Sequence, residues 1–171
     1  MSERTAPTMT TLDTISIDLP AGMRRLDGDA EPFPGTDPGR ATDAVTDERR
    51  WLSDDALYVA VTVSPASKGA DLDPLALDLA VGGTVERYRI HFSGSVDSMT
   101  KLDIAGAVAG RGARMHLESA SGEALELLLV AALTPDRDVV TVQASWPATL
   151  AARYADRART LGRSFAVPVA T

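Results

Sequence analysis

The stretch Ala124–Leu133, ALELLLVAAL, constrains the fold more than any other part of the chain. Both alternating sets of its positions are mostly apolar, so a strand formed here would have both of its faces buried. Turn-forming residues bound it, and the stretches on either side, GARMHLES and VVTVQAS, have the pattern of strands. The sequence therefore predicts a three-strand antiparallel meander, with one face of its middle strand against helices.

The segment that closes the chain has the pattern of an amphipathic helix beginning near Pro147, since proline is favoured in the first helical turn. Its apolar residues recur at steps of four, four, three and four, which places them on one stripe: Leu150, Tyr154, Ala158, Leu161 and Phe165. Four arginines lie off this stripe: Arg153, Arg157, Arg159 and Arg163. We expect this helix to cover the sheet and the last residues to be extended.

Two earlier stretches alternate as strands do. Thr14–Pro20 is predicted to be the first strand, and Asp55–Pro65 the clearest central one. In the latter, Leu57, Val59, Val61 and Val63 share one face, and Tyr58, Ala60 and Thr62 share the other.

Two further segments are expected to be irregular. Residues 1–13 are predicted to be a loose tail ahead of one α/β domain over 14–171. Residues 27–50 are predicted to be a long acidic loop, with a short helical turn near Asp43–Arg49 and with Phe33 or Val45 holding the loop to the body. Its proline and glycine content opposes regular structure.

The stretch Asp71–Phe92 supports two predictions. Leu75, Leu77 and Leu79 alternate ahead of Gly82-Gly83, which favours a hairpin slightly, because each glycine would cost a helix roughly 1 kcal/mol. Asp73 followed by Pro74 is equally typical of a helix start.

Composition excludes several classes of function. The 171 residues contain no cysteine and carry a net charge of −7, so thiol chemistry and phosphate-backbone binding are not expected. No uncharged apolar stretch is long enough for a membrane span, and the first twenty residues lack a signal-peptide pattern. We expect a cytoplasmic protein.

No motif for metal, cofactor or catalysis stands out. Asp27, Asp29 and Glu31 begin like a calcium loop, but Pro32 occupies the place where such a loop needs glycine. The two histidines, His91 and His116, lie in separate elements without a second ligand at metal spacing. The glycine-rich stretch 106–112 has no nucleotide fingerprint. We therefore predict no cofactor.

The last sixty residues resemble a known family pattern. VAGRGARMHLES, then ALELLLVAALTPDRDVVTVQASWP, then LAARYADRARTLGRSFAV are similar to the C-terminal half of the PsbP-like α/β sandwich families, which include the DcrB and LpqN groups. ISIDLPAGM is similar to their first strand, with Met23 where an aromatic residue is usual. The resemblance implies an α+β fold, mainly an antiparallel sheet backed by helices, with a long helix near Asp73–Phe92. It also implies a binding, lipoprotein or secretion-chaperone role without a shared catalytic site.

Three functions remain open from the sequence. The first is a non-catalytic binding or chaperone-like module linked to secretion, with a protein client and a possible homodimer. Its candidate partner-binding residues are Trp51, Tyr58, Ala60, Thr62, Arg153 and Arg157, and the small residues Ala105, Ala107 and Ala109 could line the same face. The second is a small hydrolase or isomerase that uses His91 or His116. The third is a carbohydrate-binding sandwich, because WLSDDALYVAVTVS is similar to a strand of such domains.

Overall fold

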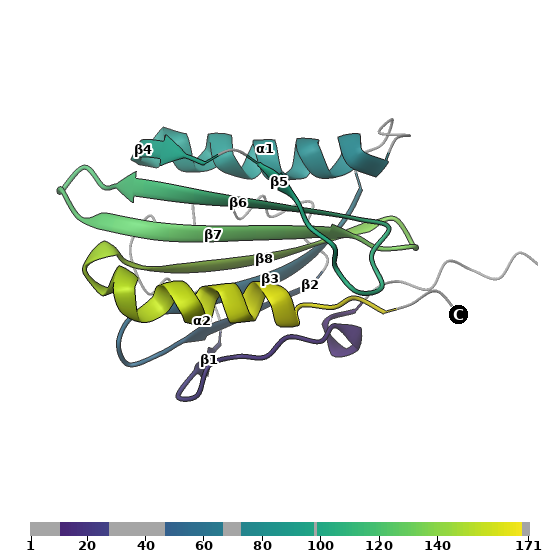
Figure 1. Cartoon of the computed structure of the whole chain (residues 1–171), viewed down its shortest axis with the longest axis horizontal. Helices are drawn as coiled ribbons and strands as arrows, with labels where there is room; N and C mark the ends of the chain where they lie inside the picture. Colours follow the sequence, from purple (N-terminus) through teal and green to yellow (C-terminus); the bar gives the residue numbers. More distant parts are fainter. Residues whose placement is uncertain (1–10, 28–46, 67–72, 98, 169–171) are drawn as a thin grey trace, which may run out of the picture.

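A computed structural model describes residues 11–27, 47–66, 73–97 and 99–168. It contains one antiparallel sheet of eight strands, in the order β1-β2-β3-β8-β7-β6-β4, with β5 paired beside β4 on β6 (Figure 1). The strands are β1 Arg24–Leu26, β2 Asp47–Leu52, β3 Tyr58–Pro65, β4 Ser93–Val96, β5 Thr100–Lys101, β6 Ala109–Glu118, β7 Ala124–Leu133 and β8 Asp138–Pro147. The helices are α1 Asp73–His91 and α2 Ala151–Ser164, and two 3-10 turns span η1 Leu12–Thr14 and η2 Ala148–Leu150.

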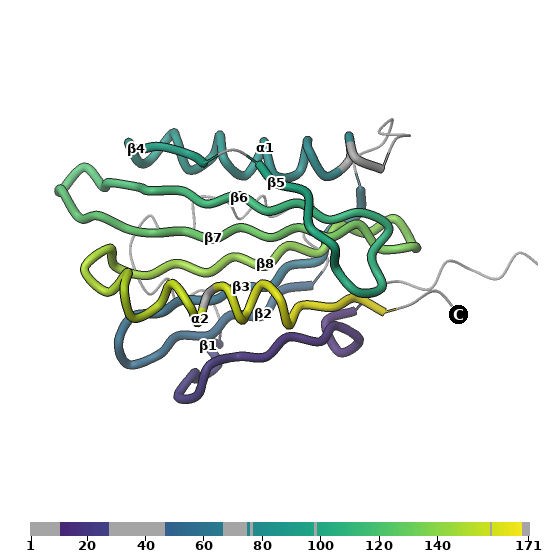
Figure 2. The backbone as a smooth tube through the Cα atoms, viewed as in Figure 1, coloured from purple at the N-terminus to yellow at the C-terminus, as the bar shows by residue number. Residues whose placement is uncertain are grey.

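The predicted meander is confirmed as β6, β7 and β8. Strand β7 is buried on both faces because its two sets of side chains enter different cores. Leu127, Leu129 and Leu133 lie in the core under α1, whereas Val130 and Ala132 lie in the core under α2. Both helices contact this strand, from opposite sides of the sheet (Figures 1 and 2). The α+β class predicted from the sequence is therefore correct.

The hairpin favoured over Asp71–Phe92 is wrong, because the structure has helix α1 there. The helix buries a stripe at steps of four, four, three and four against β6 and β7: Leu77, Val81, Val85, Tyr88 and Phe92. Burying each such side chain stabilises the fold by about 1.5–3 kcal/mol. That gain exceeds the cost of Gly82 and Gly83, about 1 kcal/mol each in a helix.

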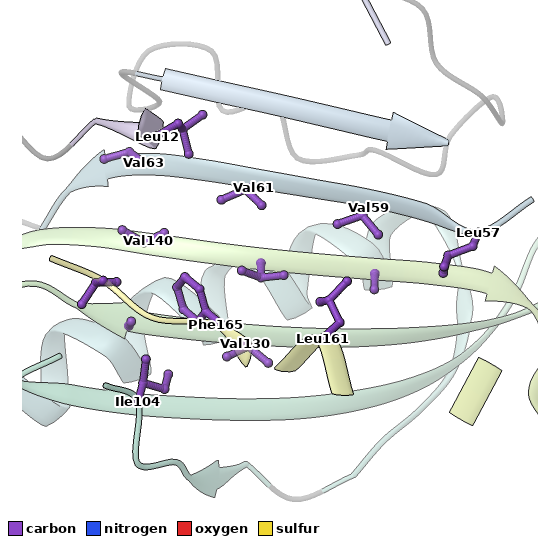
Figure 3. Close-up of a cluster of buried hydrophobic side chains, with 14 of the residues drawn as sticks. Leu12, Leu57, Val59, Val61, Val63, Ile104, Val130, Val140, Leu161 and Phe165 are labelled. Atoms are coloured by element: carbon purple, nitrogen blue, oxygen red, sulfur yellow. The ribbon is translucent and has the colours of Figure 1, made fainter. Parts of the chain in front are cut away.

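The apolar stripe of α2 is confirmed by the structure. Leu161 and Phe165 are buried against β3, β7 and β8 (Figure 3). Tyr154 is buried in the same core, and Leu150 is half-buried at the start of the stripe. The chain passes from β8 through η2 before α2 begins, so the helix starts four residues after Pro147. The side chain of Ala158 lies outside the described residues.

The N-terminal predictions need correction. Thr14–Pro20 is not a strand: among the described residues it makes a single bridge, between Ser16 and Ala166. Ile15, Ile17 and Leu19 pack on the α2-side core. Leu12, expected in a loose tail, is buried beside Val63 in the same core (Figure 3). These side chains alternate because they line the edge of a core, not because their backbone pairs in a ladder.

The predicted loop over residues 27–50 ends earlier than expected. Asp47–Arg50 belong to β2, which pairs with all of β3 except its last two residues, so the expected helical turn does not include Asp47–Arg49. Arg49 is bonded to Asp13, and Asp47 accepts a hydrogen bond from the Leu12 backbone. Residues 28–46, including Phe33 and Val45, lie outside the described part.

The glycine-rich stretch before β6 has a packing role. A Cβ at Gly110 would lie 2.6 Å from the carbonyl oxygen of Leu102, and one at Gly106 would lie 2.1 Å from that of Val167. Gly106 also has a φ of +80°. Glycine thus lets the segment before β6 lie against the sheet and against the extended chain end.

Candidate functional site

The structure separates the predicted partner-binding residues into two groups on opposite faces of the sheet. Tyr58, Ala60 and Thr62 point to the α1 side of β3, and Tyr58 and Ala60 are buried. Trp51 lies on the α2 side, packed at the edge of that core. A single surface cannot contain both groups, so the strand face bearing Tyr58 is not an open platform.

The three alanines do not join that face either. Ala105 lies in the segment before β6, where it bridges Ala166, and Ala107 packs on the α2-side core. Ala109 is the first residue of β6 and pairs with Leu133. The proposed small-residue surface is therefore not formed.

Arg153 and Arg157 of α2 are brought together over one aromatic ring. Their guanidinium carbons lie 5.9 Å and 5.5 Å from the centroid of the buried Tyr154 ring. Contacts at this distance between a cation and the face of an aromatic ring are attractive. Arg153 Nη1 also lies 3.1 Å from Oδ2 of Asp55, in the loop between β2 and β3. These contacts restrict the positions of both arginines.

The loop that holds Asp55 is itself well ordered by hydrogen bonds. Ser53 Oγ donates to Asp55 Oδ1 at 2.6 Å and accepts from the Leu57 backbone N–H at 3.0 Å. Ala56 has a φ of +69°, which closes the turn in the left-handed region. Asp55 is thereby fixed near the N-terminus of α2, where Arg153 can reach it.

These contacts change the acid–base behaviour of the cluster. The Ser53 hydroxyl is the main reason that the pKa of Asp55 is lowered, and Tyr154 and Arg153 act in the same direction. Burial raises the pKa of Tyr154, and Asp55 adds to that rise. Within the described residues the Tyr154 hydroxyl has no hydrogen bond of standard geometry. The cluster therefore presents a carboxylate and two cations, while the hydroxyl bonded to that carboxylate, Ser53 Oγ, belongs to a buried residue.

The outer side of α2 is basic. Arg153, Arg157, Arg159 and Arg163 are all exposed, and the one acid of the helix, Asp156, is bonded to Arg159 at 2.9 Å. The whole chain carries a net charge of −7. We call these four arginines the arginine face. It is a positively charged patch on a molecule whose net charge is negative.

A second polar cluster surrounds His116 on the α2 side of β6 and β7. His116 Nδ1 lies 2.7 Å from Glu126 Oε1, and its Nε2 lies 3.7 Å from Asp97 Oδ1. Arg114 donates from Nε and Nη2 to Glu126 Oε2 at 3.2 Å and 3.1 Å. The Glu126 side chain is only 11% exposed, and the Arg114 guanidinium and the His116 ring both contact its carboxylate, which compensates its burial.

This second cluster does not form a catalytic triad. Both ring nitrogens of His116 face carboxylates, and no hydroxyl bonds to the ring in the part of the chain described. His91 is exposed at the end of α1, which packs on the other face of the sheet. The two histidines therefore do not share a site, and no group of metal-ligating residues forms within the described ranges.

The predicted carbohydrate-binding architecture is also wrong. Such a sandwich packs two sheets face to face. Here there is one sheet, and helices cover both of its faces.

Sequence reasoning missed Ser53, Asp55 and Glu126. Glu126 had a signal, because it is the one charged residue in the apolar stretch of β7 and so needs a partner when buried. The signal for Asp55 was weaker, because the sequence SDDA between two strands indicates a turn but no partner. The pairing of Asp55 with Arg153 joins residues 98 positions apart, which no local pattern shows.

Within the described residues, no helix is long and apolar enough to cross a membrane. No family model and no curated protein matches the sequence.

Solved structures do match the fold. LpqN of Mycobacterium tuberculosis, described as involved in cell envelope biogenesis, is 14% identical with a TM-score of 0.59, over 90% of this chain and 83% of that one. Cyanobacterial PsbP from Synechocystis sp. PCC 6803 is 13% identical with a TM-score of 0.60, over 98% and 97%. The Ran-binding protein Mog1p of Saccharomyces cerevisiae is 12% identical with a TM-score of 0.55, over 92% and 93%. The chain therefore has the PsbP-like α/β fold that the resemblance implied.

Proposed function

We propose that this chain is a non-catalytic protein-binding module whose recognition surface is the arginine face of α2. The observation that carries the proposal is the arrangement of Arg153 and Arg157 over the Tyr154 ring, with Arg153 also bonded to Asp55. Side chains that are already restricted lose less conformational entropy on binding, which favours a preorganised surface. The expected partner is a protein with an acidic segment.

Two further observations support a binding role. A structural neighbour is described as a Ran-binding protein, and it shares the fold over 92% of this chain. In the two polar clusters, the hydroxyl bonded to a carboxylate is that of Ser53, which is buried, and the lowered pKa of Asp55 makes that carboxylate a weak base. A module that recognises a charged partner needs neither a nucleophile nor a base.

The test is a comparison of captured proteins from the native host. Arg159→Glu with Arg163→Glu changes the arginine face without touching Asp55 or Tyr154, and Arg24→Glu with Arg25→Glu on β1 makes the same change in net charge elsewhere. We expect partners recovered by the wild type and by the β1 variant to be lost with the α2 variant. Recovery of the same proteins by all three would refute the arginine face as the recognition surface.

The salt dependence of binding provides a second measurement. Interactions between exposed charges are screened by salt, and they act mainly on the association rate. We expect capture by the wild type to weaken as ionic strength rises. Binding that is insensitive to salt would contradict recognition by arginines.

An intramolecular alternative is that the arginines hold the acidic part of residues 27–50 that precedes β2. Hydrogen exchange of that segment in the Arg153→Glu, Arg157→Glu, Arg159→Glu variant separates the two. If the amides of the segment exchange faster while the same partner proteins are captured, the arginines hold the segment. If the exchange is unchanged and the partner proteins are lost, the result supports the proposal.

A further inference from the structure

Two arginines of the arginine face are already paired with carboxylates of this chain. Arg153 Nη1 lies 3.1 Å from Oδ2 of Asp55, in the loop between β2 and β3. Arg159 Nη1 lies 2.9 Å from Oδ1 of Asp156, in the same helix. Each pair uses part of the positive charge and some of the N–H donors of its guanidinium. An acidic partner must therefore compete with these carboxylates for both groups.

The other two arginines, Arg157 and Arg163, are exposed and make no ion pair with a carboxylate among the described residues. They differ in how their side chains are held. The guanidinium carbon of Arg157 lies 5.5 Å from the centroid of the Tyr154 ring. Arg163 lies in the last turn of α2, where the carbonyl end of the helix already interacts favourably with its charge. Arg157 thus combines an uncompensated charge with a restricted side chain.

The ring that restricts Arg157 is itself fixed, because Tyr154 is fully buried in the α2-side core. The attraction between a guanidinium and an aromatic ring uses no hydrogen-bond acceptor, so the N–H donors of Arg157 remain for a ligand. These donors form a planar fork that matches the two oxygens of a carboxylate. A side chain that is ordered before binding also loses less conformational entropy when the ligand binds.

We propose that the Arg157 fork binds a carboxylate of the acidic partner, and that Asp55 is an internal competitor that occupies Arg153 and lowers the affinity of the arginine face. This inference rests on the proposed function, and it adds which residue anchors the partner and which residue opposes it. Arg153 and Arg157 are four residues apart, so they are neighbours on one flank of α2. The partner therefore meets an open guanidinium with the negative charge of Asp55 close by.

Asp55 is held in position to compete, yet it can be displaced. Ser53 Oγ donates to its Oδ1 at 2.6 Å, while its Oδ2 faces Arg153. The pKa of Asp55 is lowered, chiefly by the Ser53 hydroxyl, so the carboxylate keeps its charge at neutral pH. The side chains of Asp55 and Arg153 are 30% and 56% exposed. An ion pair at the surface contributes little free energy, so a partner can replace it.

The first test is fluorescence anisotropy of a labelled oligo-glutamate peptide with the full chain at low ionic strength, since salt screens exposed charges. Arg157→Gln is expected to raise the dissociation constant at least about tenfold, the usual effect of removing a charged hydrogen-bond partner. Arg163→Gln removes the same charge from the same helix and should raise it less than about fivefold. Equal losses for the two variants, or a larger loss for Arg163→Gln, would overturn Arg157 as the anchor.

Arg157→Lys separates the charge from the shape of the side chain. Lysine keeps the positive charge but cannot form the planar fork. We expect Arg157→Lys to raise the dissociation constant of the peptide more than Arg163→Lys does. Equal binding of the peptide by Arg157→Lys and the wild type would show that charge alone is recognised, and would overturn the forked contact.

Competition by Asp55 is tested with Asp55→Asn, whose side-chain oxygen can still accept the hydrogen bond from Ser53. The control is Asp54→Asn, which removes the same charge from the neighbouring, exposed residue. We expect Asp55→Asn to lower the dissociation constant about two- to fivefold more than the control does. In a chain that also carries Arg153→Gln this extra gain should disappear, because no guanidinium is left to release. Equal effects of the two asparagine variants, or a gain that persists without Arg153, would overturn the competition.

These experiments distinguish the failure of this inference from the failure of the proposed function. A wild type that does not bind the peptide overturns the inference, whatever the capture experiment gives. Capture of the same host proteins by the wild type and by Arg159→Glu with Arg163→Glu overturns the proposed function, and the inference with it. If that variant loses the host proteins while Arg157→Gln and Arg163→Gln weaken peptide binding equally, the arginine face remains the recognition surface and the role of Arg157 alone is refuted.

Discussion

Helices α1 and α2 cover opposite faces of the same sheet and differ in what they leave to solvent. Each buries one stripe against the strands, with Leu77 and Tyr88 on α1 and Tyr154 and Leu161 on α2. The outer side of α2 is basic, whereas the outer side of α1 carries exposed leucine and isoleucine. One fold thus holds two helices in the same structural role with opposite surface chemistry.

This difference shows that covering the sheet uses only part of each helix. The inner stripe must be apolar for the fold, but the fold does not determine the residues on the outer side. Because the two outer sides differ, they suit different contacts.

The largest expected effect comes from removing the inner contacts. Leu161→Ala on α2 and Leu77→Ala on α1 should each lower the free energy of unfolding by about 2–5 kcal/mol, since both side chains are fully buried. Phe165→Ala should act like Leu161→Ala. Urea denaturation measures these losses. A loss below about 1 kcal/mol for the variant in one helix alone would show that the two helices do not stabilise the sheet equally.

Glycine-to-alanine changes should give smaller effects of the opposite sign. Gly82→Ala should raise the free energy of unfolding of a dilute sample by up to about 1 kcal/mol, because alanine favours the helix and meets open space. Gly162→Ala in α2 is the matched variant. Its methyl group would lie 3.6 Å from Val130 Cγ2 and 3.7 Å from Leu128 Cδ2, an ordinary contact, so it should also stabilise. Destabilisation by Gly82→Ala would show that the glycine has a role inside the fold.

The arginines of α2 should contribute less, and unequally. Arg153→Ala and Arg157→Ala remove contacts with Tyr154 and should each cost about 0.5–1 kcal/mol. Arg159, paired only with Asp156 in its own helix among the described residues, should cost under about 0.5 kcal/mol. Thermal denaturation of the three variants gives the order. If Arg159→Ala proves the costliest, the stacked arrangement does not stabilise α2.

The smallest expected effect is a pH dependence of the free energy of unfolding, caused by Asp55 near the N-terminus of α2. The pKa of Asp55 is lowered in the fold, chiefly by the Ser53 hydroxyl, so the carboxylate stabilises the fold fully above its unfolded pKa, near 4. That contribution is lost as the pH falls through the lower, folded pKa. Asp55→Asn should therefore differ from the wild type at pH 7 and converge with it towards pH 3, as followed by urea denaturation. Asp54→Asn, next to it and exposed, is the control, and a constant difference at all pH values would contradict this origin.

The two helices also differ in how far the sequence predicted them. The inner stripe of α2 could be predicted because its other side is charged, so the 3.6-residue period stands out. In α1 both sides are apolar, and Leu75, Leu77 and Leu79 then imitate the alternation of a strand. The pair Gly82-Gly83 also favours a hairpin turn over a helix. Only the sheet beneath the helix decided which of these leucines are buried.

The sequence by itself determined the C-terminal meander, the central strand β3, the inner stripe of α2 and the α+β class, because each depends on a local period of apolar residues. The tertiary structure alone decided that Ser16 would bridge Ala166, that Asp55 would reach Arg153, and that Tyr58 would be buried while Trp51 lies on the opposite face. These contacts join residues far apart in the chain. Their free energy depends on which faces meet when the sheet and helices pack, and no neighbouring residues in the sequence carry that information.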